Sequence, residues 1–230
     1  MRPGKPSLLK RFVGAALLAG AAALLWSCRP LRPVFSPLPP QVNSIEGHAS
    51  FRLTREGAAV KSRFSFLFLL PDRGRIEVSD PLGRTVSLLF LEKEEAFFVL
   101  PRKHAYWRAS RVEVLSKLLG FALSPEEMTS LLTGKAEQMK GWVMDSDARG
   151  RAVRGRRDDL QFEISEFYGS SSLPQVISLS SAADRGHLKI LRLTFNQPLK
   201  DGVFKLAFLE DAAYAAATWE EIEKWLQNER

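Results

Sequence analysis

Residues 63–83 read RFSFLFLLPDRGRIEVSDPLG, and this stretch decides the fold class. Phe64, Phe66 and Phe68 fall at every second position, which is the period of a strand with one face turned toward a core. A turn signal follows at 71–74, and the next one stands a strand length later at 80–83. Strands joined by such short turns pair antiparallel, so the stretch predicts an antiparallel hairpin.

The two-residue period continues outward from this hairpin on both sides. No helical segment interrupts the runs before residue 111, which argues against a parallel sheet of alternating strands and helices. We therefore expect a mainly β domain built on an antiparallel meander. Further strands are expected at 49–54, 86–90, 96–100, 160–165, 177–179, 191–195 and 204–208.

Three segments have a helical period instead. The leucines that precede Gly120 share one face of a helix that begins near Val112. Ser124-Pro125-Glu126-Glu127 is a capping box that begins a second helix, which runs to Gly134. Apolar residues within 211–230 have the spacing of an amphipathic C-terminal helix.

Residues 1–27 have the three parts of a bacterial signal peptide. Basic residues lie between Arg2 and Arg11, an Ala- and Leu-rich run extends to Trp26, and the small Ser27 precedes Cys28. The apolar run is shorter than the ~20 residues that a spanning helix needs. The sequence therefore predicts export followed by cleavage before Cys28.

Cys28 is the only cysteine in the 230 residues, so no disulfide within the chain is possible. A lone cysteine at this position fits a lipoprotein acylation site better than an uncleaved anchor with an incidental cysteine. Residues 28–43 contain several prolines and are expected to form an extended tether that holds the domain off the membrane.

The charge of the chain gives little support to nucleic-acid binding. The formal net charge is +7, but four basic residues belong to the predicted signal, which leaves +3 after cleavage. Charged residues crowd the segment 145–159. This segment is expected to be a solvated loop or hairpin tip, with a basic patch for lipid headgroups or an acidic partner as the alternative.

Signatures of enzymes and metal sites are missing from the sequence. The three histidines, His48, His104 and His187, form no metal-binding motif, and neither a nucleophile elbow nor a phosphate-binding glycine loop is found. We expect no enzymatic activity, no cofactor and no metal. The 15 phenylalanines, many on two-sided apolar strands, fit either an apolar container for acyl chains or an ordinary dry core, and the pattern alone does not choose.

The pattern resembles the LolB-type outer-membrane lipoprotein receptors, which are related in fold to the LolA carriers. The likeness rests on the lipoprotein start, a Gly47-His48-Ala49-Ser50-Phe51 strand, an aromatic Arg63-Phe64-Ser65-Phe66 strand, and the turn Asp80-Pro81-Leu82-Gly83. A leucine-rich helix and a short capped helix ending at Gly134 follow. The resemblance covers residues 44–134 well and the remainder through strand pattern.

The resemblance implies a half-open antiparallel β-barrel of about 10–11 strands, closed by short helices, over residues 44–210. Its apolar cavity would hold acyl chains. The residues expected to line this cavity are Phe51, Phe64, Phe66, Phe68, Ile76, Val78, Val86, Leu88, Phe90, Leu115, Leu118 and Leu119.

The function that the resemblance implies is lipoprotein delivery. A monomer, lipid-anchored at the periplasmic face of the outer membrane, would accept acylated lipoproteins from a LolA-like periplasmic carrier and insert them into that membrane without ATP. Arg29 after Cys28, rather than aspartate, fits outer-membrane delivery. The alternative is a tethered envelope lipid-binding or scaffold lipoprotein of the same fold with another cargo or partner.

The resemblance also singles out Leu82. In the family, a leucine exposed at the corresponding turn reaches into the bilayer, and Pro81, Leu82 and Gly83 form the matching membrane-insertion loop. Burying one leucine side chain contributes ~1.5–3 kcal/mol, which would aid transfer to a membrane. The alternative is a Leu82 that folds back onto the domain.

Overall fold

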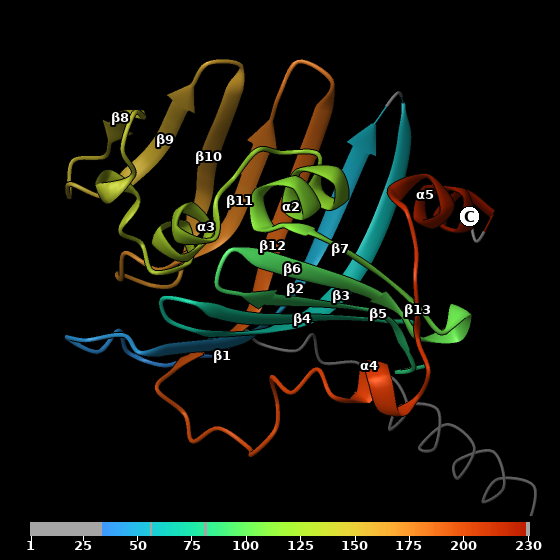
Figure 1. The fold of residues 1–230 in the computed structure, drawn as a ribbon. Coiled ribbons are helices and arrows are strands. Elements are labelled where there is room, and N and C mark those ends of the chain that lie inside the picture. The colour runs from blue at the N-terminus through green and yellow to red at the C-terminus, as the bar shows by residue number, and fades with distance from the viewer. Residues whose placement is uncertain (1–33, 56, 81, 229–230) are drawn as a thin grey trace, which may run out of the picture. The chain divides into compact units, whose positions relative to one another are not determined.

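An antiparallel sheet carries the fold, as the strand pattern predicts (Figure 1). The computed structural model describes residues 34–55, 57–80 and 82–228, and from Pro33 onward the chain forms one compact unit. The predicted signal peptide, Cys28 and Pro81 lie outside the described residues.

Thirteen strands form the sheet within these residues, in the order β8-β9-β10-β11-β12-β2-β3-β4-β5-β6-β7-β13, with β1 beside β12. The strands are β1 (Val34–Phe35), β2 (Ser44–Arg55), β3 (Ala58–Leu69), β4 (Arg73–Ser79), β5 (Thr85–Glu92), β6 (Glu95–Leu100), β7 (Ala105–Ser110), β8 (Val143–Ser146), β9 (Ala152–Arg157), β10 (Leu160–Phe167), β11 (Pro174–Ser180), β12 (Asp184–Phe195) and β13 (Ala215–Ala216).

The sheet is open, which confirms the half-open architecture. In the described part of the chain, β8 and β13 stand at its two ends, and neighbours along the order pair antiparallel except β13 with β7. β1 and β13 are two residues long and pair parallel, with β12 and β7 respectively. The long pairing of β12 with β2 joins the two halves of the meander.

The alternating phenylalanines of β3 lie on the inner face as the period predicts. Phe66 and Phe68 are buried, opposite Gly47 and Ile45 of β2. Gly47 has no room for a side chain, because a Cβ there would lie 2.4 Å from the Arg192 carbonyl oxygen and from the Phe66 ring. Gly47, the fourth residue of β2, is therefore required by close packing.

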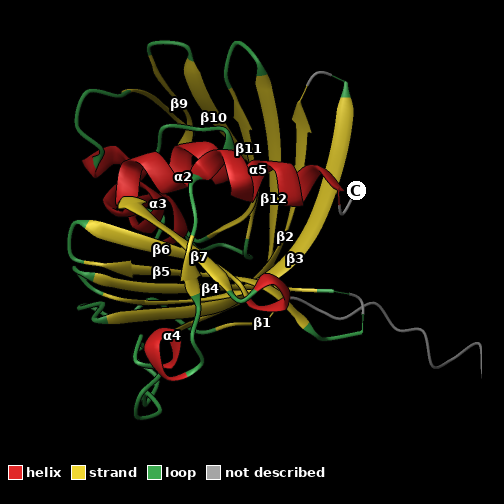
Figure 2. Ribbon diagram, turned by 45° about the vertical axis from the view of Figure 1, so that its right-hand side comes forward, coloured by secondary structure: helices red, strands yellow, loops and turns green. Residues whose placement is uncertain are grey.

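Three helices gather on the inner side of the sheet, and a short one lies on the other side (Figure 2). They are α2 (Arg111–Leu119), α3 (Pro125–Leu132) and α5 (Trp219–Asn228), and the outer one is α4 (Phe208–Asp211). Short 3-10 helices η1 (Pro101–Lys103) and η2 (Ala136–Gln138) connect other elements. The three inner helices pack into one continuous core, to which they contribute the buried side chains of Leu115, Leu131 and Ile222.

The predicted boundaries of α2 and the predicted start of α3 are confirmed, whereas α3 ends at Leu132, two residues before the expected Gly134. The Ser110 hydroxyl accepts a hydrogen bond from the Glu113 amide at the start of α2, and Gly120 ends it at φ 77°. Both halves of the capping box formed by Ser124 and Glu127 are present at the start of α3.

The prediction of a strand at 204–208 is wrong. This segment turns into α4 and packs Leu206 and Phe208 against an outer apolar cluster with Phe90, Val99 and Leu209 at its centre. Since β2 and β11 already flank β12, the chain leaving it finds no free edge nearby. Leu206 and Phe208 are partly buried on the outer face of the sheet instead.

The described part of the expected tether lies on the domain rather than apart from it. Val34 and Phe35 pair with Arg192 and Leu193 of β12, and the Ser36 amide donates to the Leu193 carbonyl at 2.9 Å. Phe35 is buried and stacks on Tyr168 with ring centroids 4.3 Å apart. Extended backbone suits strand pairing as well as it suits a linker, and the aromatic contact holds it there.

The charged segment 145–159 contains the tip of the β8–β9 hairpin, as the simpler interpretation predicts. Its arginines are largely neutralised locally. Arg151 pairs with Asp147, Arg154 with Glu163, and Arg157 with Glu127. Three of the five arginines in the segment are thus paired with carboxylates, and Arg149 and Arg156 are exposed.

Candidate functional site

An apolar cavity lies between the inner face of the sheet and α3. Strands β2, β3, β4, β11 and β12 supply its walls, and α3 with the end of α2 covers it. All thirteen lining side chains are apolar: Phe51, Phe64, Phe66, Phe68, Ile76, Leu119, Leu123, Met128, Leu131, Leu132, Ile177, Leu179 and Leu188.

The structure places half of the residues expected to line a cavity around this one. Those brought together are Phe51, Phe64, Phe66, Phe68, Ile76 and Leu119. Leu115 and Leu118 belong to the core but lie away from the cavity, because they pack elsewhere in the large cluster. Val78 and Val86 border an open hollow beside the 80–83 turn instead.

Leu88 and Phe90 lie on the wrong side of the sheet for this cavity. They belong to the outer cluster, where the Arg75 guanidinium lies 5.4 Å from the centre of the Phe90 ring. The inner face of β5 carries Leu89 and Leu91, opposite Ile76 and Gly74. Because β5 is apolar on both faces, its period could not show which face turns inward.

Seven residues that line the cavity were not predicted to do so from the sequence. They come from the loop before α3, from α3 itself, and from β11 and β12. Met128, Leu131 and Leu132 do have the spacing of one helix face. That spacing identifies a buried helix, but only the folded chain shows that this helix covers a cavity.

The cavity is small, with a volume of about 70 Å³. Ordinary ligand pockets measure roughly 300–1,000 Å³, so α3 and the sheet are almost closed on each other.

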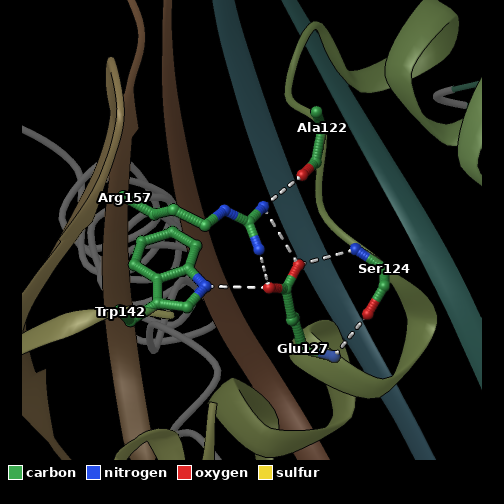
Figure 3. Close-up of polar contacts among 5 residues, drawn as sticks. All are labelled: Ala122, Ser124, Glu127, Trp142 and Arg157. Atoms are coloured by element: carbon green, nitrogen blue, oxygen red, sulfur yellow. Dashed lines mark hydrogen bonds and ion pairs between the residues drawn. The ribbon is translucent and has the colours of Figure 1, made fainter. Parts of the chain in front are cut away.

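One polar cluster fastens α3 over the cavity (Figure 3). The Glu127 carboxylate accepts hydrogen bonds from the Trp142 indole at 2.8 Å, the Ser124 amide at 2.9 Å, and the Arg157 guanidinium. Arg157 also donates to the Ala122 carbonyl at 2.9 Å and lies 4.9 Å from the centre of the Trp142 ring. A single carboxylate thus caps α3 and ties it to β9.

A second feature of the molecule is the turn at 80–83, where Leu82 is 77% exposed. The Asp80 carboxylate accepts hydrogen bonds from the Leu82 amide at 2.9 Å and the Arg84 amide at 3.0 Å. It also pairs with the guanidinium groups of Arg84 and Arg102. The Arg84 backbone amide, followed by its side chain and the Leu82 amide, lowers the pKa of Asp80. Gly83 has φ 79°, a conformation that favours glycine.

The same turn occurs a second time, at the tip of the β8–β9 hairpin. Asp147 accepts hydrogen bonds from the Arg149 and Arg151 amides and from the Arg151 side chain, which lowers its pKa chiefly through that side chain. The shared spacing, Asp-x-x-Gly-Arg, is visible in the sequence and was overlooked. At the position of Leu82 the second turn has Arg149.

Other kinds of site are not seen among the described residues. No group of three or more His, Cys, Asp or Glu there could hold a metal ion. None of the helices in the described ranges is long and apolar enough to cross a membrane.

The sequence and the fold are similar to those of known proteins. The family model for the outer membrane lipoprotein LolB matches residues 44–197, more than half of the chain. The outer-membrane lipoprotein LolB of Serratia proteamaculans (strain 568) is 23% identical over 185 residues, which cover 76% of this chain and 88% of the relative.

Two solved structures share the fold. A domain from Vibrio parahaemolyticus, proposed to be an outer membrane lipoprotein-sorting protein, has a TM-score of 0.55 and 12% identity, with 74% of this chain and 93% of that one covered. A LolA-superfamily protein from Nitrosomonas europaea has a TM-score of 0.50 and 10% identity, with 74% and 94% covered. These two likenesses concern the fold alone. The family match over residues 44–197 shows that the chain belongs to the LolB family of outer-membrane lipoproteins.

Proposed function

We propose that this protein is a lipid-anchored receptor that takes lipoprotein acyl chains into the cavity beneath α3. It receives them from a soluble LolA-like periplasmic carrier and releases them into the outer membrane. The observation that carries the proposal is a cavity lined only by apolar side chains in a chain of the LolB family. Transfer between apolar environments requires no bond making, cofactor or ATP.

Uptake of an acyl chain requires the cavity to widen well beyond about 70 Å³. We propose that α3 moves away from the sheet. The helix has only eight residues, and glycines at positive φ flank it at 120 and 134. Backbone of this kind can absorb a change in direction, as hinges do. The Glu127 cluster then holds the closed state, since it is the charged link between α3 and β9.

Anchoring belongs to the same proposal. Acylation of Cys28 would hold the monomeric domain at the periplasmic face of the outer membrane. Five residues separate Cys28 from Val34, where the described chain joins the sheet. The anchor thus keeps the domain next to the membrane that receives its cargo.

Leu82 fits a role at that membrane because the fold does not need it. The equivalent turn at Asp147 forms with an arginine at the tip, so an exposed leucine is not a requirement of the turn. Insertion of one leucine side chain into a bilayer contributes ~1.5–3 kcal/mol. We propose that Leu82 makes this insertion while the cargo is released.

The acceptance step is tested with the acylated protein and a LolA-type carrier loaded with radiolabelled lipoprotein. We expect the label to move to the receptor without ATP. A carrier that delivers to a known receptor but gives nothing to this protein would contradict the proposal. A stable protein partner on an empty domain, seen by native mass spectrometry, would then favour a scaffold role.

The release step is tested with Leu82→Glu. We expect this variant to accept lipoprotein normally and to transfer it to vesicles about ten-fold or more slowly, because a charge opposes insertion. Arg149→Glu, at the tip of the equivalent turn, is the matched control and should transfer at the wild-type rate. Equal rates for Leu82→Glu and wild type would remove the role given to Leu82.

A further inference from the structure

The outer face of the sheet over β12, β2 and β3 carries a field of cations. Residues directly opposite each other in an antiparallel ladder project to the same face. One such row contains His187, Arg52 and Lys61, and the next contains Lys189, Ser50 and Arg63. We call this surface the basic face, and its cations are Arg52, Lys61, Arg63, Arg185, Lys189 and Arg192, all exposed.

The pairing on the basic face differs from that elsewhere in the sheet. At other places a cation lies opposite a carboxylate, as in Arg73 with Glu92 and Arg154 with Glu163. On the basic face Arg52 lies directly opposite Lys61, with His187 on its other side. Among the described residues none of the six cations forms a salt bridge. Like charges in opposing positions destabilise a sheet, so a binding partner explains the arrangement better than stability does.

The basic face is continuous with the Leu82 turn. Lys61, Arg63 and Ser79 line an open hollow of about 660 Å³ together with Asp80 and Gly83 of that turn. The Asp80 carboxylate adds no free negative charge there, because Arg84, Arg102 and two backbone amides already occupy it. An exposed leucine therefore stands at the margin of a surface of uncompensated cations.

The chain that follows Cys28 joins the sheet beside a cation of the basic face. Val34 pairs with Arg192, and the proposed anchor at Cys28 precedes it by six residues. Six residues span at most about 20 Å when fully extended, so an acylated Cys28 keeps this edge of the basic face close to the bilayer. This step rests on the anchoring proposed above.

We propose that the basic face binds the anionic phospholipid headgroups of the membrane surface, and that it holds the domain flat while Leu82 enters the apolar layer. A bilayer offers phosphates beside an apolar interior, which matches cations beside an exposed leucine. The cavity opens on the opposite side of the sheet, so the molecule faces the membrane with one surface and cargo with the other.

The test uses residues 33–230, the compact unit with its own continuous core, so that no lipid anchor contributes to binding. Vesicles of phosphatidylcholine alone are compared with vesicles that also contain phosphatidylglycerol. The test variant is Arg52→Gln, Lys61→Gln and Arg63→Gln combined. The matched control is Lys140→Gln, Arg149→Gln and Lys224→Gln, which removes the same charge from exposed cations elsewhere.

We expect wild type to prefer the anionic vesicles and to lose that preference at high salt, where the screening length falls to a few ångströms. Each cation at an anionic surface contributes about five-fold, so the test variant should bind those vesicles about 100-fold more weakly. The control should lose little. The test variant should also be at least as resistant to urea as wild type, since a like-charge pair is removed.

Equal losses in the test and control variants would overturn the proposal, because net charge alone would then explain binding. Normal vesicle binding with loss of carrier docking would also overturn it and assign the face to an acidic protein. Leu82→Glu separates this proposal from the membrane-insertion role of Leu82, since it should weaken binding to both kinds of vesicle. Lipoprotein acceptance, measured separately, should stay normal in the test variant.

Discussion

At the scale of single residues, Asp80 and Asp147 show how one carboxylate builds a hairpin tip. Each carboxylate accepts hydrogen bonds from two backbone amides and from a guanidinium. A glycine at positive φ stands three residues after each aspartate. The two turns are alike in backbone and differ at the tip, where one presents Leu82 and the other Arg149. The tip residue is thus free to serve a purpose other than folding.

The hydrogen bonds to Asp80 predict how the Leu82 turn depends on pH. The charged form of Asp80 is favoured in the fold, so the contribution of its carboxylate is complete above the ordinary aspartate pKa of 3.8 and is lost as the pH falls through the lower folded-state pKa. We expect the amide resonance of Leu82 to stay constant from neutral pH down to 3.8 and to move below it. Asp80→Ala should give the released resonance at every pH.

Asp147→Ala is the control for this measurement. It should shift the amide of Arg149 at the second tip and leave that of Leu82 in place. A Leu82 amide that titrates near neutral pH would contradict the assignment to Asp80.

At the scale of elements, α3 is a short helix with two different attachments. Its apolar face covers the cavity through Met128, Leu131 and Leu132, and its first turn is tied to β9 by Glu127. The apolar face packs against a nearly closed cavity, whereas the ionic link is directional and is broken by a small displacement. The relative strengths of the apolar packing and of the Glu127 ion pair determine how readily α3 leaves the sheet.

Glu127→Ala removes the carboxylate that Arg157, Trp142 and the Ser124 amide share. Leaving these partners unpaired should lower the free energy of unfolding by about 1–3 kcal/mol, measured by urea denaturation. Hydrogen exchange should increase most in α3, and a fluorescent fatty acid should enter the cavity more readily. Glu113→Ala, an exposed carboxylate on α2, is the control and should change neither property. Unchanged exchange in α3 would show that Glu127 does not hold the helix closed.

At the scale of the whole molecule, the C-terminal segment returns to the core after crossing the outer face. It follows α4, adds β13 to the edge strand β7, and ends in α5 on the inner side. Trp219 packs on Trp107 with ring centroids 4.9 Å apart, and Ile222 is fully buried. Residues 211–228 therefore belong to the domain and are not a separate helical appendage.

This integration predicts a large effect from Ile222→Ala. The change removes a fully buried side chain, so the free energy of unfolding should fall by roughly 2–5 kcal/mol in a single cooperative transition. Urea denaturation followed by circular dichroism measures it. Glu223→Ala, on the exposed side of the same helix, should stay within about 0.5 kcal/mol of wild type. A loss of α5 alone, with the sheet unaffected, would show that the helix is an appendage after all.

Local features of the chain were predictable wherever the signal was local. The alternation Phe64-Phe66-Phe68, the turn at 80–83, the glycine that ends α2 and the capping box of α3 are each set by residues a few positions apart. Such signals act through backbone sterics and hydrogen bonds within one turn or one strand. They also carried the resemblance to the LolB family, and the family match confirms it.

Tertiary structure alone decided which face of a two-sided apolar strand turns inward. Phe90 and Leu89 are equally apolar, yet one joins the outer cluster and the other the inner core, because α4 covers the outside of β5. The strand expected at 204–208 failed for the same kind of reason, since pairing requires a free edge that the sequence does not show. The basic face likewise arises from β12 meeting β2 far along the chain. Alternation fixes which residues share a side, but only long-range pairing determines what that side meets.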